Sequence, residues 1–222
     1  MGYQEIMKKN REEYIKVLLS DITDLFIQNG IDDMKMTTLA KELDVGVASL
    51  YRYFHTKKDL IILSGIEVWT RINNLFEGVF ESESYQNKTG YKQVEDLMKI
   101  NLVLYDGHQE LLSFINDFDN FVIKEKIQTS ELKAYEASVL NVSTLVENAY
   151  NKGLKDGSIK YTGNFFEFYF TCSHAINALC RKVANQGMIL ESDRLVEGKI
   201  QLELLINVML NYIKEDIHEE GN

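Results

Sequence analysis

The stretch "VGVASLYRYFHTKKDL", residues 45–60, places aromatic rings, an arginine and two lysines in one short segment of an acidic chain. On a helix that turns about 100° per residue, Leu50 and Phe54 fall on one side. The rest of the surface combines small residues with large hydrogen-bonding ones: Ala48, Ser49, Arg52 and Tyr53, with Val47 and Tyr51 at the rim. The pattern predicts a short helix over 47–54 that packs through Leu50 and Phe54.

Two further helices are expected before this one and a fourth after it. Apolar positions at helical spacing predict a helix over residues 11–28, which "NG" at 29–30 ends. "TTLAKEL" predicts a second helix with Thr37 as its cap, and "DVG" at 44–46 breaks it. Thr56 is expected to cap a fourth helix that continues toward Phe80. Three short helices with a tight turn before the third describe a helix-turn-helix.

The remainder of the chain also predicts helices. No proline occurs among the 222 residues, and the 13 glycines are scattered. Apolar spacing predicts further helices over 91–105, 108–127, 130–153, 163–186 and 191–216. The fold class expected is therefore all-α, with about nine helices: an N-terminal three-helix head and a C-terminal bundle.

Composition limits the possible functions. The net charge is −10, but residues 1–60 hold nine basic and ten acidic side chains, so a local basic surface stays possible. The sequence shows no signal peptide or span-length apolar run, so a cytoplasmic location is expected. Cys172 and Cys180 lie eight residues apart on one expected helix, too far for a disulfide. Cys172 and His174 diverge by about 200°, so no metal site is expected.

The third helix has the composition of a DNA-reading element. A major groove admits a helix only where some positions are small and others supply donors or methyl contacts. Ala48 and Ser49 are small, and Arg52 can bind guanine or a phosphate. Lys57 stands at the expected start of the fourth helix, where free amides already attract phosphate. No glycine-rich phosphate loop or nucleophile elbow appears, so neither an enzyme nor a cofactor is predicted.

Over about residues 10–65 the sequence resembles the DNA-binding head of TetR/AcrR-type transcriptional regulators. The resemblance rests on "TTLAKELDVGVASLYRYFHTKKDL", whose end fits the family pattern L-Y-x-[HY]-F-x-x-K-x-x-L. The chain departs from that pattern at Lys35, Asp44 and Gly46, where a threonine, a glycine and a serine are common. The resemblance implies a head over residues 1–56 and a ligand-binding, dimerising body over 57–222. Residues at DNA-contact positions are Thr37, Val47, Ala48, Ser49, Tyr51, Arg52, Tyr53 and Lys57.

The body is expected to hold a small-molecule pocket. Many aromatic rings within helices form core in most proteins, yet such bundles often enclose an apolar cavity with a few polar groups. Candidate lining residues are Trp69, Asn101, Tyr105, His108, Phe114, Phe118, Tyr135, Phe170, His174 and Asn177. Asn116 is a further polar candidate. The expected effector is small and apolar or aromatic.

The last two expected helices are candidates for subunit contact. "FFEFYFTCSHAINALC", residues 165–180, is apolar on nearly all sides and must be covered on all sides. Either a homodimer packs these helices into a four-helix bundle, as the resemblance implies, or one chain buries a central helix. A dimer would bind a palindromic operator. The resulting hypothesis is a ligand-responsive repressor; the alternative is a helical small-molecule-binding or interaction protein without specific DNA readout.

Overall fold

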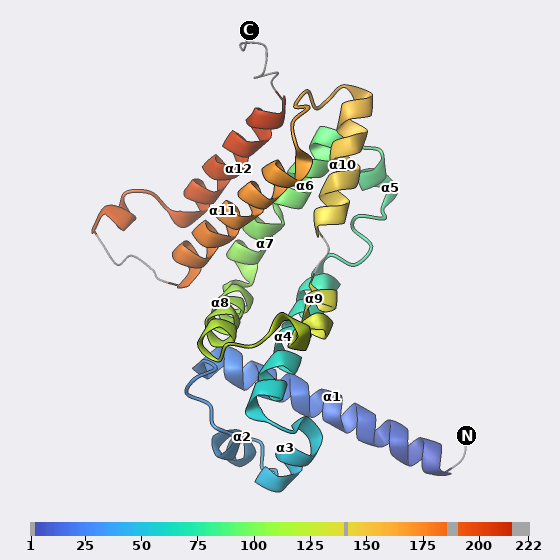
Figure 1. Ribbon diagram of the computed structural model, residues 1–222, viewed down its shortest axis with the longest axis vertical. Coiled ribbons are helices and arrows are strands. Elements are labelled where there is room, and N and C mark those ends of the chain that lie inside the picture. The colour runs from blue at the N-terminus through green and yellow to red at the C-terminus, as the bar shows by residue number, and fades with distance from the viewer. Residues whose placement is uncertain (1–2, 140–141, 186–190, 215–222) are drawn as a thin grey trace. The chain divides into compact units, whose positions relative to one another are not determined.

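The computed structural model describes residues 3–139, 142–185 and 191–214 (Figure 1), and within these ranges every regular element is helical. The first four helices are α1 (Tyr3–Asn29), α2 (Met36–Glu42), α3 (Val47–Phe54) and α4 (Lys57–Leu75). The next are α5 (Glu83–Gln86), α6 (Gly90–Met98), α7 (Ile100–Gly107), α8 (Gln109–Lys124), η1 (Thr129–Glu131) and α9 (Lys133–Ser138). The last are α10 (Val142–Asp156), α11 (Phe165–Asn185), η2 (Glu191–Arg194) and α12 (Gly198–Lys214).

The all-α prediction is confirmed, but the described residues form twelve α-helices rather than about nine. The helix expected over 91–105 is divided at Lys99, which ends α6 and precedes α7. The segment expected as one helix over 130–153 contains η1, α9 and α10, and its residues 140–141 lie outside the described residues. The fourth helix ends at Leu75 instead of continuing to Phe80. The expected ends at 186 and 216 also lie outside the described ranges.

The chain forms two compact units. The first comprises Met1–Leu75 and Ser113–Leu140, and the second comprises Phe76–Leu112 and Asn141–Asn222. The first unit therefore adds α9 and most of α8 to the four N-terminal helices. This division by contacts differs from the functional boundary expected at residue 56, which stays a prediction.

The core of the first unit explains the short α3. Leu50 and Phe54 are 0% and 1% exposed, as their positions on one side of the helix predict. They join a buried set on the neighbouring helices: Ile22, Phe26, Leu39, Ala40, Leu60 and Ile61. Burying a side chain of this size contributes about 1.5–3 kcal/mol, which outweighs the low intrinsic stability of an eight-residue helix.

The helix ends in this unit correct one expectation and confirm another. Thr37 is not the cap of α2, because the helix already begins at Met36 with Lys35 as its N-cap. Thr56 Oγ1 does cap α4, since it accepts a hydrogen bond of 3.0 Å from the Asp59 amide. Asp44 has a positive φ of 50°, a conformation that aspartate tolerates better than most residues.

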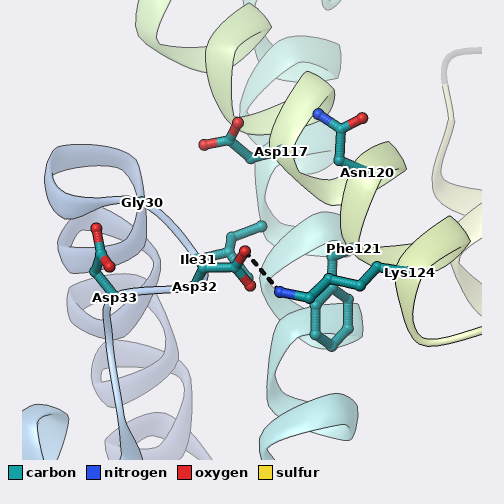
Figure 2. Close-up of a pocket in the computed structure, with 8 residues that line it drawn as sticks. All are labelled: Gly30, Ile31, Asp32, Asp33, Asp117, Asn120, Phe121 and Lys124. Carbon is teal, nitrogen blue, oxygen red and sulfur yellow. Dashed lines mark hydrogen bonds and ion pairs between the residues drawn. The ribbon is translucent and has the colours of Figure 1, made fainter.

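A polar joint connects the α1–α2 loop to α8 within the first unit (Figure 2). Lys124 Nζ lies 2.9 Å from a carboxylate oxygen of Asp32. Beside this ion pair is a cavity of about 230 Å³, lined by Gly30, Ile31, Asp32, Asp33, Asp117, Asn120, Phe121 and Lys124. Loss of water and the nearby Asp32 raise the pKa of Asp117. The sequence did not reveal this joint, because its two halves lie about ninety positions apart.

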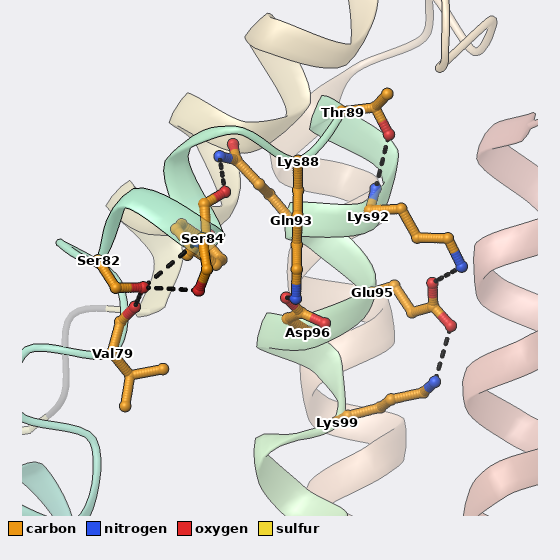
Figure 3. Close-up of polar contacts among 11 residues, drawn as sticks. Val79, Ser82, Ser84, Lys88, Thr89, Lys92, Gln93, Glu95, Asp96 and Lys99 are labelled. Atoms are coloured by element: carbon orange, nitrogen blue, oxygen red, sulfur yellow. Dashed lines mark hydrogen bonds and ion pairs between the residues drawn. The ribbon is translucent and has the colours of Figure 1, made fainter.

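In the second unit, α6 and α10 approach closely. A Cβ atom on Gly90 would lie 2.0 Å from the Gly153 amide nitrogen, so only glycine permits this spacing. The exposed side of α6 carries an ion-pair ladder in which the Glu95 carboxylate bonds both Lys92 and Lys99 (Figure 3). These lysines lower the pKa of Glu95 against the opposing effect of its partial burial. The ladder reinforces α6 close to its break at Lys99.

The chain before α11 is fixed to α12 by main-chain bonds. The amides of Lys160 and Tyr161 both donate to the Ile213 carbonyl oxygen, at 3.0 and 3.2 Å. Tyr150 on α10 donates its hydroxyl to the Tyr161 carbonyl. These contacts connect α10, the segment after it and α12 in the second unit.

Candidate nucleic-acid interface

The face of α3 opposite its buried residues is open to solvent. Tyr51 is 48% exposed, whereas Leu50 and Phe54 on the same helix are buried. Ala48 and Arg52 are also exposed, while Val47, Ser49 and Tyr53 are half-buried. The prediction is confirmed for the inward Leu50 and Phe54 and for the outward Ala48 and Arg52. It differs at Ser49 and Tyr53, which are half-buried, and at Tyr51, which was expected at the rim and is exposed. This arrangement leaves small side chains beside donors on one accessible surface.

Arg52 and Tyr53 form a local pair on this surface. Arg52 Nη2 donates to the Tyr53 hydroxyl at 2.9 Å, and its guanidinium carbon lies 4.8 Å from the ring centroid. The same nitrogen is 3.5 Å from Ser49 Oγ. The pair holds a positive charge at the surface of α3 without a carboxylate partner among the described residues.

Lys57 begins α4, as predicted, but its amine has protein partners. Lys57 Nζ donates to the Ile31 carbonyl at 2.9 Å and lies 3.4 Å from the Asp32 carbonyl. Burial lowers the pKa of Lys57, with a further decrease from Lys124 and opposing increases from Asp32 and Asp33. Lys57 thus joins the start of α4 to the loop after α1. The sequence predicts only a phosphate contact for this lysine.

Thr37 is exposed in the first turn of α2. The helix-turn-helix therefore exposes predicted contact residues on α2 as well as on α3. Gly46, the N-cap of α3, gives that helix no side-chain cap, so no side chain of the N-cap accepts from its first amides. Backbone donors and the α3 side chains together suit a polyanion.

Four of the predicted pocket residues meet in the first unit. The Trp69 ring nitrogen donates to the Tyr135 hydroxyl at 2.9 Å. The Tyr135 ring stacks on Phe118 at a centroid distance of 4.3 Å, and Phe118 stacks on Phe114 at 6.4 Å. Burial raises the pKa of Tyr135 to about 12. The four residues form a continuous aromatic cluster between α4, α8 and α9.

The other six predicted pocket residues lie in the second unit, on α7 or at its end and on α11. Asn101, Tyr105 and His108 belong to α7 or its end, and all three are half-buried. Phe170, His174 and Asn177 are exposed along one side of α11, where the Phe170 and His174 rings lie 6.0 Å apart. Their assignment to a pocket stays a prediction.

Sequence reasoning missed a second cavity, of about 350 Å³, between α11 and α12. It is lined by Tyr161, Glu167, Phe168, Thr171, Cys172, Val208, Met209 and Tyr212.

Cys172 and Cys180 are buried free thiols, and burial raises their pKa values to about 12 and about 11. In the described part of the chain, no group of three or more metal-ligating side chains converges. No described helix is long and apolar enough to cross a membrane.

The sequence comparisons identify the N-terminal segment. Residues 18–62 match the family model described as bacterial regulatory proteins, tetR family. A helix-turn-helix-type transcriptional regulator of Staphylococcus aureus is 35% identical over 78 residues, which are 35% of this chain and 38% of that protein. The match thus spans little more than a third of that relative's length.

The structural comparisons cover nearly the whole chain. A ketosteroid transcriptional regulator of Mycobacterium tuberculosis has a TM-score of 0.60 at 11% identity, covering 91% of this chain and 96% of that one. The TetR family regulator PfmR of Thermus thermophilus has a TM-score of 0.57 at 12% identity, covering 87% and 97%. These similarities show a shared fold. The N-terminal segment therefore matches the tetR family model, and the chain shares the fold of the two regulators.

Proposed function

We propose that the protein is a transcriptional regulator, acting as a repressor, that binds a palindromic operator as a homodimer and is released by a small apolar or aromatic effector. The observation that carries the proposal is the exposure of Tyr51 and Arg52 on a helix whose Leu50 and Phe54 are fully buried. A helix arranged in this way can enter a major groove while staying anchored in its own domain.

The contact residues proposed are those expected from the sequence. Ala48 and Ser49 allow close approach to the groove, and Arg52 supplies a bidentate donor for guanine or phosphate. Tyr51 and Tyr53 supply hydroxyl groups for phosphate or ring contacts with a thymine methyl. Thr37 and Val47 border this surface. Lys57 contributes positive charge near the phosphates and stabilises the head through Ile31.

The homodimer is proposed to form through α11 and α12. Large apolar side chains on both helices are exposed in the single chain, and unpaired surface of this kind marks a protein interface. These are Phe166 and Phe170 on α11 and Ile200, Leu204, Val208 and Tyr212 on α12. A symmetric pair would place two heads on half-sites about 34–36 Å apart, or a multiple of that distance.

The effector is proposed to bind at the aromatic cluster of the first unit. The rings of Trp69, Phe118 and Tyr135 are in contact there, and α4, which carries Trp69, also holds two buried polar atoms, Ser64 Oγ and Asn73 Oδ1, that have no hydrogen-bond partner among the described residues. Buried polar groups without partners are costly, so a ligand that bonds them would gain affinity. Helix α4 carries Ser64, Trp69 and Asn73 and begins beside α3, so a shift of α4 would link effector and head.

Footprinting of the DNA upstream of the protein's own gene tests the proposal. We expect a symmetric protected site whose affinity falls steeply with salt, because bound phosphates release counterions. Equal binding to a shuffled duplex would instead favour an interaction protein with no specific DNA readout. Trp69 is the only tryptophan in the chain, so a compound that releases the footprint should also change its fluorescence.

A further inference from the structure

We infer that Arg11, on α1, is an additional DNA-phosphate contact and that Tyr53 positions it together with Arg52. The inference rests on the proposed function and extends the DNA surface from α3 onto the long first helix. It assigns Tyr53 a positioning role beyond any direct contact of its own. Its evidence is a set of ring and guanidinium contacts around Tyr53.

Two guanidinium groups meet the ring of Tyr53. The guanidinium carbon of Arg52 lies 4.8 Å from the ring centroid, and that of Arg11 lies 5.6 Å from it. Both distances are within the range of a favourable cation–π contact. Arg52 also donates to the Tyr53 hydroxyl, so ring and hydroxyl hold one arginine while the ring holds the other.

The ring of Tyr53 is itself held in place. Tyr14, three residues after Arg11 on α1, meets it edge to face at 6.0 Å, and Phe54 meets it edge to face at 6.4 Å. Tyr14 is 46% exposed, whereas Phe54 is buried. Tyr53 therefore bridges the exposed side of α1 and the core of the helix-turn-helix. Its orientation fixes where both guanidinium groups lie.

The charge of this cluster is not neutralised within the described part of the chain. Lys8, one turn before Arg11, faces Glu12 at 3.9 Å, but neither Arg11 nor Arg52 has an ion pair with a carboxylate there. Both arginines are exposed. Two adjacent cations that share one ring repel each other, and an anion between or beside them would remove that cost. Guanidinium groups bind phosphate with good geometry, and the DNA backbone is the anion next to α3 in the proposed complex.

The test measures how DNA affinity depends on salt for the wild type and for six variants, four single and two double. Fluorescence anisotropy is measured on the footprinted upstream duplex and on a shuffled duplex of the same length. Arg11→Gln should reduce the magnitude of the slope of log affinity against log salt by about 1.8, which corresponds to one phosphate for each subunit of the proposed dimer, and by the same amount on both duplexes. Lys16→Gln removes an equal charge from an exposed position of α1 and should leave that slope unchanged.

Variants of Tyr53 test the positioning role. When Arg11→Gln is added to Tyr53→Leu, it should change the salt slope by less than half as much as it does in the wild type, because Arg11 no longer has the Tyr53 ring to hold it. In Tyr53→Phe the ring remains, so Arg11→Gln should regain its full effect. Thermal unfolding of each protein confirms that the variants are folded.

The outcomes separate this inference from the proposed function. If Arg11→Gln matches Lys16→Gln while the wild type still selects its operator, Arg11 is not a phosphate contact and the inference is wrong. If the wild type binds both duplexes equally, the proposed function fails, and the slope change on the shuffled duplex still decides the role of Arg11. An equal effect of Arg11→Gln with leucine or tyrosine at position 53 would refute the positioning role.

Discussion

Lys57 Nζ donates to the Ile31 carbonyl oxygen at 2.9 Å and thereby connects the start of α4 to the loop that ends α1. The lysine predicted as a phosphate contact thus also holds the head together. Lys57 Nζ also lies 3.4 Å from the carbonyl oxygen of Asp32, and the carboxylate of Asp32 forms an ion pair with Lys124 of α8. A single loop therefore receives contacts from α4 and from α8 within the first unit.

Replacing Lys57 by methionine should lower the free energy of unfolding by about 1 kcal/mol. A charged hydrogen bond to a main-chain carbonyl contributes somewhat more than this when buried, and Lys57 is partly exposed. Urea unfolding followed by circular dichroism measures the effect. Lys16→Met, at an exposed site on α1, is the matched control and should leave stability unchanged. Identical midpoints for both variants would show that the Lys57–Ile31 bond contributes nothing.

Stability at alkaline pH should depend on Tyr135. Burial raises the pKa of Tyr135 to about 12, whereas the unfolded chain ionises this group near pH 10. The neutral hydroxyl therefore stabilises the fold fully below pH 10, and that contribution is lost as pH rises toward 12. In Tyr135→Phe, the fall in unfolding free energy between these pH values should be smaller by up to about 1.4 kcal/mol per pH unit.

Tyr85→Phe provides a second variant of the same kind, because burial raises the pKa of Tyr85 to about 12 as well. Urea unfolding at a series of pH values from 8 to 12 gives the slope of unfolding free energy against pH for the wild type, Tyr135→Phe and Tyr85→Phe. Slopes that match the wild type in both variants would contradict the link between burial and ionisation.

The close approach of α6 and α10 should make Gly90 intolerant of any side chain. Gly90→Ala places a Cβ atom against the main chain of Gly153, and we expect a loss of about 2 kcal/mol or more in unfolding free energy. Gly107→Ala is the control, since no atom lies within 4 Å of its Cβ position. Thermal unfolding should show a lower midpoint for the first variant only. Equal midpoints would mean that the helices separate without cost.

Leu204→Glu should convert the proposed homodimer into monomers. Leu204 is 64% exposed in the single chain and lies in the apolar row of α12, so a buried carboxylate at the interface would be unpaired. Ile123→Glu on α8 changes a residue that is 74% exposed and should leave the dimer intact. Sedimentation velocity gives the mass of each. A Leu204→Glu protein that stays dimeric would place the interface elsewhere.

Local patterns predicted the helix-turn-helix well and longer-range features less well. The bounds of α3, its buried Leu50 and Phe54 and the Thr56 cap all follow from residues within a few positions of each other. The division at Lys99 does not, because the apolar spacing continues through it. The prediction of Thr37 as a cap is wrong because the N-cap is Lys35, whose side chain has no acceptor for a helix amide. Exposed rings on α11 cannot be distinguished from pocket rings by spacing, since both are apolar.

The central claim is that the open face of α3 enters DNA, and affinity for the footprinted duplex tests it most directly. Tyr51→Ala combined with Arg52→Gln should weaken binding at least about 100-fold, since each base or phosphate contact contributes about 1–3 kcal/mol. Both side chains are exposed, so the unfolding midpoint and the oligomeric state should not change. A folded double variant that binds the duplex as tightly as the wild type would contradict the claim.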